Sequence, residues 1–469
     1  MRTRPITVML LMLLATTEVL AATPQSVRRE DQRDVMVTIY NGNLGLVKDI
    51  REVRVPAGTT EVQFMEVAAQ IDPTTVHLKS LTDPAGLRIL EQNYEYDLLT
   101  SAKLLEKYVG KTVRLYQTDG TYHEARLLST NGPIFEINGA IHMGQYGRLV
   151  LPSLPENLVA QPTLVWLLRN QTPRPQRVEA SYLTGGITWK ADYVMVLNAA
   201  DTLSDLTGWV TIDDKSGAIY KDAGLKLVAG DVNRARDPRR EARLMDLAAK
   251  APSAAEASRD FQSEGFFEYH LYTLDGRTTL KDNQTKQLSL MAASEVPIVK
   301  QLIYYGAQDY YRNAYGVPIS NQKVAVYLEL KNSKENRLGV PLPKGKIRVY
   351  KADQSGSQQF IGEDWIDHTP KDERVKVKMG EAFDLVGSRT QKDWRKLAAN
   401  LYEVEWEIAL RNHKPADQTV TVVEPVPGDW QVLASSHPYE KVEAHTLRYT
   451  IPVPKDGASK LTYRVRIRY

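Results

Sequence analysis

The chain contains no cysteine among its 469 residues. It can therefore form no disulfide, and it offers no thiolate nucleophile and no cysteine-based zinc or iron site. We also expect no lipid anchor, because acylation of a bacterial lipoprotein requires a cysteine. An excess of one charge is missing too: 60 Lys and Arg stand against 57 Asp and Glu, a formal net charge of +3. This near-neutral balance gives no electrostatic reason to expect nucleic-acid binding.

Long apolar runs are absent as well. The run over residues 6–14 is shorter than the roughly 20 apolar residues that a membrane-spanning helix requires, and no later segment is longer. Arg2 and Arg4 precede this run, and Ala21 and Ala22 follow it, which is the pattern of a secretory signal peptide. We interpret residues 1–22 as that signal. The sequence thus predicts an exported protein, periplasmic or extracellular, without a transmembrane helix.

Most of the remaining sequence alternates apolar and polar residues in short runs separated by turn signals such as DG and NG. This pattern predicts a mainly β, multidomain protein built from immunoglobulin-like antiparallel β-sandwiches. The expected parts are an N-terminal β domain (34–98), a small helix-plus-barrel domain of SH3 or Sm type (99–156), a β-sandwich (160–318) and a C-terminal β-sandwich (322–469). In the small domain Ser101 is expected to cap the helix and Gly110 to end it. Strand patterning stops over 233–264, which we interpret as a surface helix and flexible loop inserted in the β-sandwich, a segment that is either functional or disordered.

One short phrase occurs three times. Alternating strands end in Leu, then Arg or Lys, then Asn at Leu168–Asn170, Leu330–Asn332 and Leu410–Asn412, and each is followed by a loop that contains proline. Asn tolerates left-handed backbone angles and bonds its own main chain, so it ends a strand well. The stretch LGVPLPKGK (338–346) is therefore predicted to be a corner between strands, with Lys344 exposed and Gly345 at positive φ.

The sequence lacks the common motifs for catalysis and for metal binding. The sequence has no G-x-S-x-G and no H-E-x-x-H, its eight histidines are scattered, and no glycine-rich phosphate loop is present. Asp213 and Asp214 in IDDKSG fit a β-turn better than a calcium loop, which needs oxygen ligands at alternate positions. We predict no catalytic residue, no metal and no cofactor.

Aromatic residues provide the candidate binding positions. Tyr310, Tyr311 and Tyr315 stand close together in a polar, turn-like context, where tyrosines could contact a sugar or a protein partner. The alternative is that they pack into a sandwich core. Trp189 alternates with Ile187 and Ala191 and is predicted to be a core residue, with exposure to a sugar ring as the alternative. Its neighbours Lys190 and Asp192 should then face water, or Asp192 should cap a turn.

Several phrases resemble a known family. SYLTGGITWKADYVMVL, GWVTIDDKSGAIYKDAGLKLVAGDV, LGVPLPKGKIRVYK and MGEAFDL are similar to the bacterial domain-of-unknown-function family 4139, over about 160 to 469. The N-terminal VTIYNGNLGLVKDIREV is similar to the small β domain of proteins named mucoidy inhibitor A, which end in the same domain. Those proteins usually carry a coiled coil between the two parts, where this chain has 100–152. The resemblance lends no catalytic residue, and the name points to envelope polysaccharide.

These observations favour a binding or scaffolding module of the cell envelope, with an envelope protein or a glycan as its partner. The alternative is a hydrolase that acts on carbohydrate or peptide with carboxylates gathered from separate strands. A cleft with two carboxylates about 5–10 Å apart would favour the enzyme. An exposed aromatic patch without such a pair would favour the binder.

Overall fold

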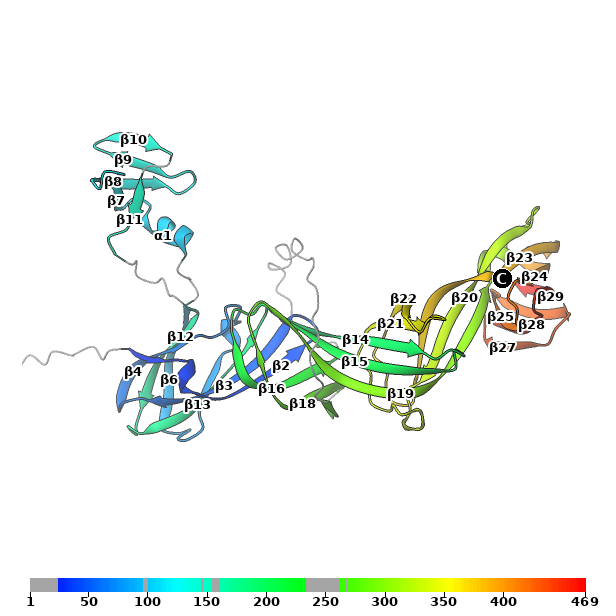
Figure 1. The fold of residues 1–469 in the computed structure, drawn as a ribbon, viewed down its shortest axis with the longest axis horizontal. Coiled ribbons are helices and arrows are strands. Elements are labelled where there is room, and N and C mark those ends of the chain that lie inside the picture. Colours follow the sequence, from blue (N-terminus) through cyan, green and yellow to red (C-terminus); the bar gives the residue numbers. More distant parts are fainter. Residues whose placement is uncertain are drawn as a thin grey trace, which may run out of the picture. The chain divides into compact units, whose positions relative to one another are not determined.

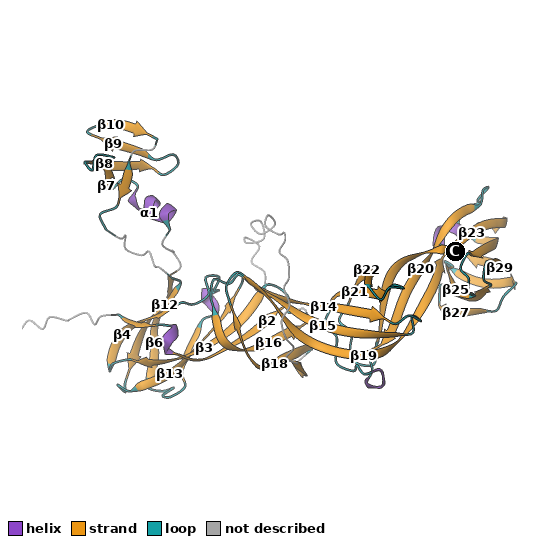
Figure 2. Cartoon of the chain, viewed as in Figure 1, coloured by secondary structure: helices purple, strands orange, loops and turns teal. Residues whose placement is uncertain are grey.

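In the computed structural model of the protein, the described residues are 24–95, 100–144, 147–153, 161–230, 232, 261–266 and 268–469. The fold is mainly β, as predicted (Figure 2). The expected signal peptide lies outside the described residues, and so does the expected insertion up to residue 260. The last four residues of the expected insertion, 261–264, belong instead to strand β17 (Phe261–Phe266), which pairs with β18 (Tyr269–Leu280). Among the described residues, no helix has the length and apolar character needed to cross a membrane.

The chain divides into two compact units. Unit 1 contains the described residues up to Met36 together with Leu46–Gly185 and Ser216–Tyr220. Unit 2 contains Val37–Gly45, Gly186–Lys215 and Lys221–Tyr469. The four domain limits given above stay predictions. Strands β2 (Gln32–Tyr40) and β3 (Leu44–Arg54) have residues in both units.

Unit 1 includes a four-stranded sheet in the order β1-β4-β12-β6. Its strands are β1 (Gln25–Val27), β4 (Gly58–Met65), β12 (Thr163–Asn170) and β6 (Leu87–Glu95). Beside them β5 (His77–Ser80) pairs with β13 (Pro175–Thr184). The alternating apolar residues of β4 and β12 form the core, where the rings of Phe64 and Trp166 meet edge to face with centroids 5.4 Å apart. The guanidinium of Arg51 lies 3.8 Å from the centre of the Phe64 ring.

Unit 1 also carries a helix and a small sheet, labelled α1 and β7 to β11 in Figure 1. Helix α1 (Ser101–Tyr108) precedes β7 (Thr112–Tyr116), β8 (Tyr122–Ser129), β9 (Ile134–Ile137), β10 (Ala140–Met143) and β11 (Arg148–Val150), in the sheet order β10-β9-β8-β7-β11. The predicted helix is confirmed, but its cap is Thr100 rather than Ser101, because the Thr100 hydroxyl accepts the Lys103 N–H at 3.2 Å. Gly110 follows the helix at φ +81°, as a C-terminal glycine should.

Unit 2 is dominated by a thirteen-stranded sheet, whose main path is β22-β21-β14-β15-β19-β20-β23-β24-β29-β26. Its strands are β14 (Ile187–Leu197), β15 (Leu203–Asp214), β19 (Gln284–Tyr305), β20 (Ile319–Lys331), β21 (Gly345–Ala352), β22 (Gln358–Ile366), β23 (Arg374–Ala398), β24 (Leu401–Asn412), β25 (Gln418–Pro425), β26 (Asp429–Ser435), β27 (Tyr439–Glu443), β28 (Thr446–Val453) and β29 (Gly457–Arg468). The pairing is antiparallel except for two parallel pairs, β14 with β21 and β19 with β25.

Trp189 on β14 is a core residue, as predicted. Its side chain is buried together with those of Ile187 and Ala191 on the same strand face. The indole N–H donates to the Val228 carbonyl at 3.2 Å, so the one polar atom of the ring is satisfied inside the core. The prediction for its neighbours is half right. Lys190 is exposed, but Asp192 is buried, because its carboxylate accepts the Thr211 hydroxyl at 2.8 Å rather than facing water.

The three repeated asparagines all end strands, and all three are buried. Asn332 at the end of β20 donates to the carbonyls of Val340 and Pro370 at 2.8 and 3.0 Å, and its Oδ1 accepts the Gly339 N–H at 3.0 Å. Asn412 at the end of β24 repeats the arrangement with Ala416, Pro454 and Lys414. Each side chain thus replaces missing main-chain partners where the chain leaves a sheet.

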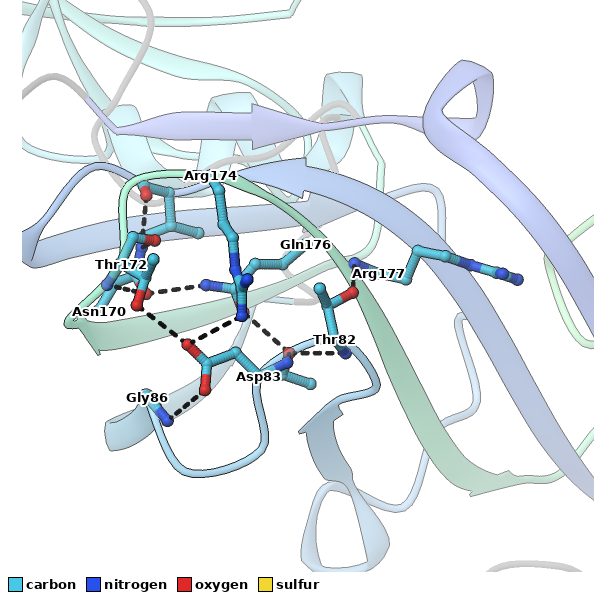
Figure 3. A network of polar contacts seen from close by, with 10 residues as sticks. Thr82, Asp83, Gly86, Asn170, Thr172, Arg174, Gln176 and Arg177 are labelled. Atoms are coloured by element: carbon cyan, nitrogen blue, oxygen red, sulfur yellow. Dashed lines mark hydrogen bonds and ion pairs between the residues drawn. The ribbon is translucent and has the colours of Figure 1, made fainter.

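Asn170 does the same at the end of β12, and its surroundings are drawn in Figure 3. It donates to the carbonyls of Val55 and Thr172 at 2.6 and 2.8 Å and accepts the Gln176 amide at 2.8 Å. The Thr172 hydroxyl in turn donates to Asp83 at 3.0 Å, and Arg174 approaches the same carboxylate at 3.5 Å. The corner is therefore cross-linked to the loop around Asp83 by these side chains, in addition to the main-chain bond from the Gln171 N–H to the Gly86 carbonyl at 3.0 Å.

Residues 338–346 form the corner that the sequence predicts, but Gly345 plays a different part in it. Its φ is not positive; Gly339, at φ +91°, takes that role. Gly345 begins β21, opposite Ala191 of β14, and a Cβ at this position would lie 2.2 Å from the Ala191 carbonyl oxygen. The glycine is needed because two main chains approach each other there.

Candidate functional site

The predicted tyrosine cluster surrounds a buried ion pair. Tyr311, in a short 3-10 helix (Gln308–Tyr311), has no exposed surface, and its hydroxyl donates to Glu424 at 2.8 Å and lies 2.9 Å from the Tyr463 hydroxyl. Tyr310 and Tyr315 are half-buried and pack on Trp406, with ring centroids 5.8 Å from it in both cases. Tyr311 is therefore a core residue, and only the exposed parts of Tyr310 and Tyr315 can contact a ligand.

Arg389 and Glu424 form that ion pair, and neither side chain has any exposed surface. Two parallel hydrogen bonds of 2.9 and 2.5 Å join them, and the guanidinium lies 4.7 Å from the Tyr310 ring and 5.3 Å from the Trp406 ring. Burial alone would lower the pKa of the guanidinium, but the Glu424 charge holds that pKa well above its ordinary value. The guanidinium therefore keeps its charge, and the pair holds the tyrosine segment in place through the bond from Tyr311 to Glu424.

A different group of side chains lies on the outer face of unit 2, where β14, β21 and β22 run next to one another (Figure 1). The register places Lys346 opposite Trp365, Arg348 opposite Glu363 and Tyr350 opposite Phe360. Directly opposite residues in an antiparallel pair share one face of the sheet. The intervening Ile347 and Val349 are buried on the inner face. We call these six outer residues, with Asp192 of β14, the platform.

The centre of the platform is a chain of ion pairs. Arg348 lies between two carboxylates, 3.4 Å from Asp192 and 3.4 Å from Glu363. Lys346 donates to Glu363 at 2.8 Å. The hydrogen bond from Lys346, aided by the charges of both cations, lowers the pKa of the Glu363 carboxyl. Two cations thus balance two anions, and the platform carries no surplus charge.

Aromatic rings stand at both ends of this charged centre. Trp365 is 64% exposed and Phe360 is 55% exposed, although large aromatic side chains are usually covered. The Lys346 ammonium lies 5.5 Å from the centre of the Trp365 ring, and Tyr350 supports Phe360 with ring centroids 5.7 Å apart. The platform is therefore an exposed aromatic patch with a polar middle.

Carboxylates also gather around an arginine of the C-terminal strands. Arg464 on β29 contacts Asp393 at 2.9 Å, Glu405 at 2.5 Å and Glu403 at 3.8 Å. Burial would raise the pKa of Asp393, but hydrogen bonds from Arg395 and Arg464 outweigh it and lower that pKa. A general acid needs the opposite shift. Among the described residues, no group of three His, Asp or Glu side chains is arranged to hold a metal ion.

A shallow, open hollow is lined by residues 432–439 at the end of β26. In it the Ser436 hydroxyl lies 2.9 Å from Nδ1 of His437, but the same oxygen also accepts the Thr462 N–H at 2.9 Å. Among the hydrogen bonds of the described residues, none joins a carboxylate to His437. A serine nucleophile needs a base that is oriented and free to take its proton, so this pair fits a strand-end contact better.

Comparison with known proteins adds no identification: no family model matches the chain, and no curated protein matches it. The resemblance to family 4139 stays a prediction. Sequence reasoning missed the platform residues, although FIGEDWID places an aromatic residue on each side of two acids within one short strand. Exposure could not be derived from this pattern, because the same alternation would also fit a buried strand.

Proposed function

We propose that this protein is an exported binding module of the cell envelope, related to family 4139, and that the platform is its binding surface. The observation that carries the proposal is the exposure of Trp365 and Phe360 on one face of a regular sheet. Exposed rings held on strands lose little conformational entropy when a partner covers them, so aromatic residues dominate many binding surfaces.

The electrostatics support binding over hydrolysis. Glu363 keeps its charge through its contact with Lys346, and Asp393 keeps its charge through two arginines. Neither is suited to deliver a proton at neutral pH. Export is supported by the signal-like residues 1–22.

Retention of the full chain on isolated cell envelopes tests the proposal. Trp365→Ala and Phe360→Ala should each weaken retention roughly tenfold, the loss expected of a central aromatic contact. Tyr439→Ala is the matched control, because Tyr439 is also exposed, at 46%, but lies on β27. Equal retention of the parent and both platform variants would refute the platform as the binding surface.

A further inference from the structure

We infer that the ligand of the platform is an uncharged glycan chain that lies along β21 and β22, with sugar rings stacked on Trp365 and Phe360. This inference rests on the proposed function, because it gives the chemistry of the partner for the same surface. Three features of the platform support it.

The first feature is the presentation of the rings. Lys346 lies over the Trp365 ring and Tyr350 lies against Phe360, so each exposed ring is held by a neighbour on β21. A flat ring fixed in this way can stack on one face of a pyranose sugar, where the axial C–H groups of the chair form an apolar surface. An irregular protein surface gains less from two isolated flat rings.

The second feature is the charge balance at the centre of the platform. Asp192 and Glu363 are matched by Lys346 and Arg348, so these four side chains together offer no excess charge to an acidic or basic polymer. It does offer acceptors and donors next to each other. A sugar hydroxyl both donates and accepts, and the guanidinium has five N–H donors, of which the two long contacts of 3.4 Å use only part.

The third feature is the spacing of the aromatic ends. Trp365 pairs with Lys346 and Phe360 pairs with Tyr350, four residues further along β21. At about 3.3 Å per residue the two ends are about 13 Å apart, which exceeds one sugar ring. The platform therefore fits an oligosaccharide that contacts both ends, rather than a monosaccharide.

An extended peptide added to the sheet would use other atoms of β22. Strand addition pairs main-chain groups along a free strand edge, and β22 is the end strand in the described sheet order. On the inner face of β22, opposite the platform, the Asp364 carboxylate accepts the Lys378 N–H of β23 at 2.6 Å, and a Cβ on Gly362 would lie 3.0 Å from the Met379 side chain. A peptide paired along the edge would gain its affinity from the main chain, so its binding would not depend on Trp365 and Phe360.

The inference is tested by titrating the full chain with three uncharged hexaoses: cellohexaose, maltohexaose and chitohexaose. Polygalacturonate serves as the acidic comparison. We expect at least one uncharged hexaose to bind with an affinity that does not change between low and high salt. Trp365→Ala should weaken this binding at least tenfold and Trp365→Tyr should restore most of it, while Tyr439→Ala should leave it unchanged. Phe360→Ala should weaken the hexaose but not the corresponding disaccharide.

Treatment of the envelope separates this inference from the proposed function. Periodate, which opens sugar rings, should abolish platform-dependent retention, and protease should not; this result supports a glycan even if none of the three hexaoses is the right one. Retention that survives periodate but is lost with protease overturns the glycan and leaves the binding module intact. Binding of polygalacturonate alone, falling steeply with salt, also overturns the uncharged ligand. If no envelope retention depends on Trp365, the proposed function itself fails.

Discussion

Arg389 and Glu424 meet through two hydrogen bonds in the core of the C-terminal strands, where neither side chain reaches solvent. The charges come from β23 and β25, strands that are not neighbours in the sheet order. Removing two charges from water is costly, and their attraction offsets this cost only when the geometry is good and the other polar atoms are satisfied. Here the Tyr311 hydroxyl supplies one further bond to Glu424, whereas the Arg389 Nε has no hydrogen-bond partner among the described residues.

Glu424→Gln should destabilise the protein by about 3–5 kcal/mol, because it leaves a buried guanidinium without a counter-charge. The loss in free energy of unfolding is measured by urea denaturation. Glu407→Gln is the control: the Glu407 contacts with Lys392 and Lys460 are 3.9 and 3.8 Å long and lie at the surface. Such pairs contribute about 0–1 kcal/mol. Similar losses for the two variants would contradict the importance of the buried pair.

Asn332→Ala should cost about 1–3 kcal/mol, because two carbonyls and one N–H would lose their partner inside the corner. Asn336→Ala provides a comparison, since Asn336 is partly exposed and its amide makes a single bond of 3.0 Å to the Lys331 carbonyl. Thermal unfolding should separate the two. Equal melting temperatures would show that the repeated asparagine is not essential to the corner.

Gly345→Ala should destabilise by about 1–3 kcal/mol, because the added Cβ collides with the Ala191 carbonyl and must push β21 away from β14. Gly316→Ala meets no atom within 4 Å and should be close to neutral. Lys344→Ala, next to the critical glycine but exposed, should leave stability and envelope binding unchanged. A well-folded Lys344→Ala protein that no longer binds would mean that this corner takes part in function.

Trp189→Ala should cost about 3–5 kcal/mol and increase protease sensitivity, since it leaves a cavity where the indole packs against Tyr272. Trp365→Ala should leave the melting temperature near that of the parent, because most of that ring is already in solvent. The pair of tryptophans thus separates stability from binding. The assignment would be reversed if Trp189→Ala melted normally and lost envelope binding.

The mature protein should begin near Ala22 or Thr23, after removal of the segment with Arg2, Arg4 and the apolar run of residues 6–14. N-terminal sequencing of the exported species measures this directly. Detection of Met1 on that species would exclude cleavage of a signal peptide.

Sequence patterns predicted the local features of this fold well. Alternation around Trp189 placed it in the core, and the repeated Leu-Lys/Arg-Asn phrase located three strand ends. Both depend on neighbours in sequence, so the information is local. The same reasoning gave the wrong φ for Gly345, because the atom that requires a glycine there belongs to Ala191, on a strand far away in sequence.

The platform and the buried pair depend on pairing between distant segments. Glu424 continues the inward face of Val420 and Val422, a visible sign of a buried charge, but nothing near it identifies Arg389 as its partner. Lys346 and Trp365 come together only through the register of β21 with β22. A shift of that register by one residue would move every ring to the other face, and no local pattern fixes it.

The parallel pairing of β14 with β21 also constrains the order in which the chain can fold. Ala191 pairs with Gly345, which follows it by about 150 residues. One edge of β14 therefore stays unpaired until that part of the chain has been synthesised. Closing so large a loop is slow, and an unpaired strand edge invites association with other chains. A growing chain would expose that edge until residue 345 has emerged, and a product truncated before that residue would expose it permanently. We therefore expect such truncated products to aggregate or to depend on a chaperone, whereas in the full-length chain β21 pairs with this edge of β14 and covers it.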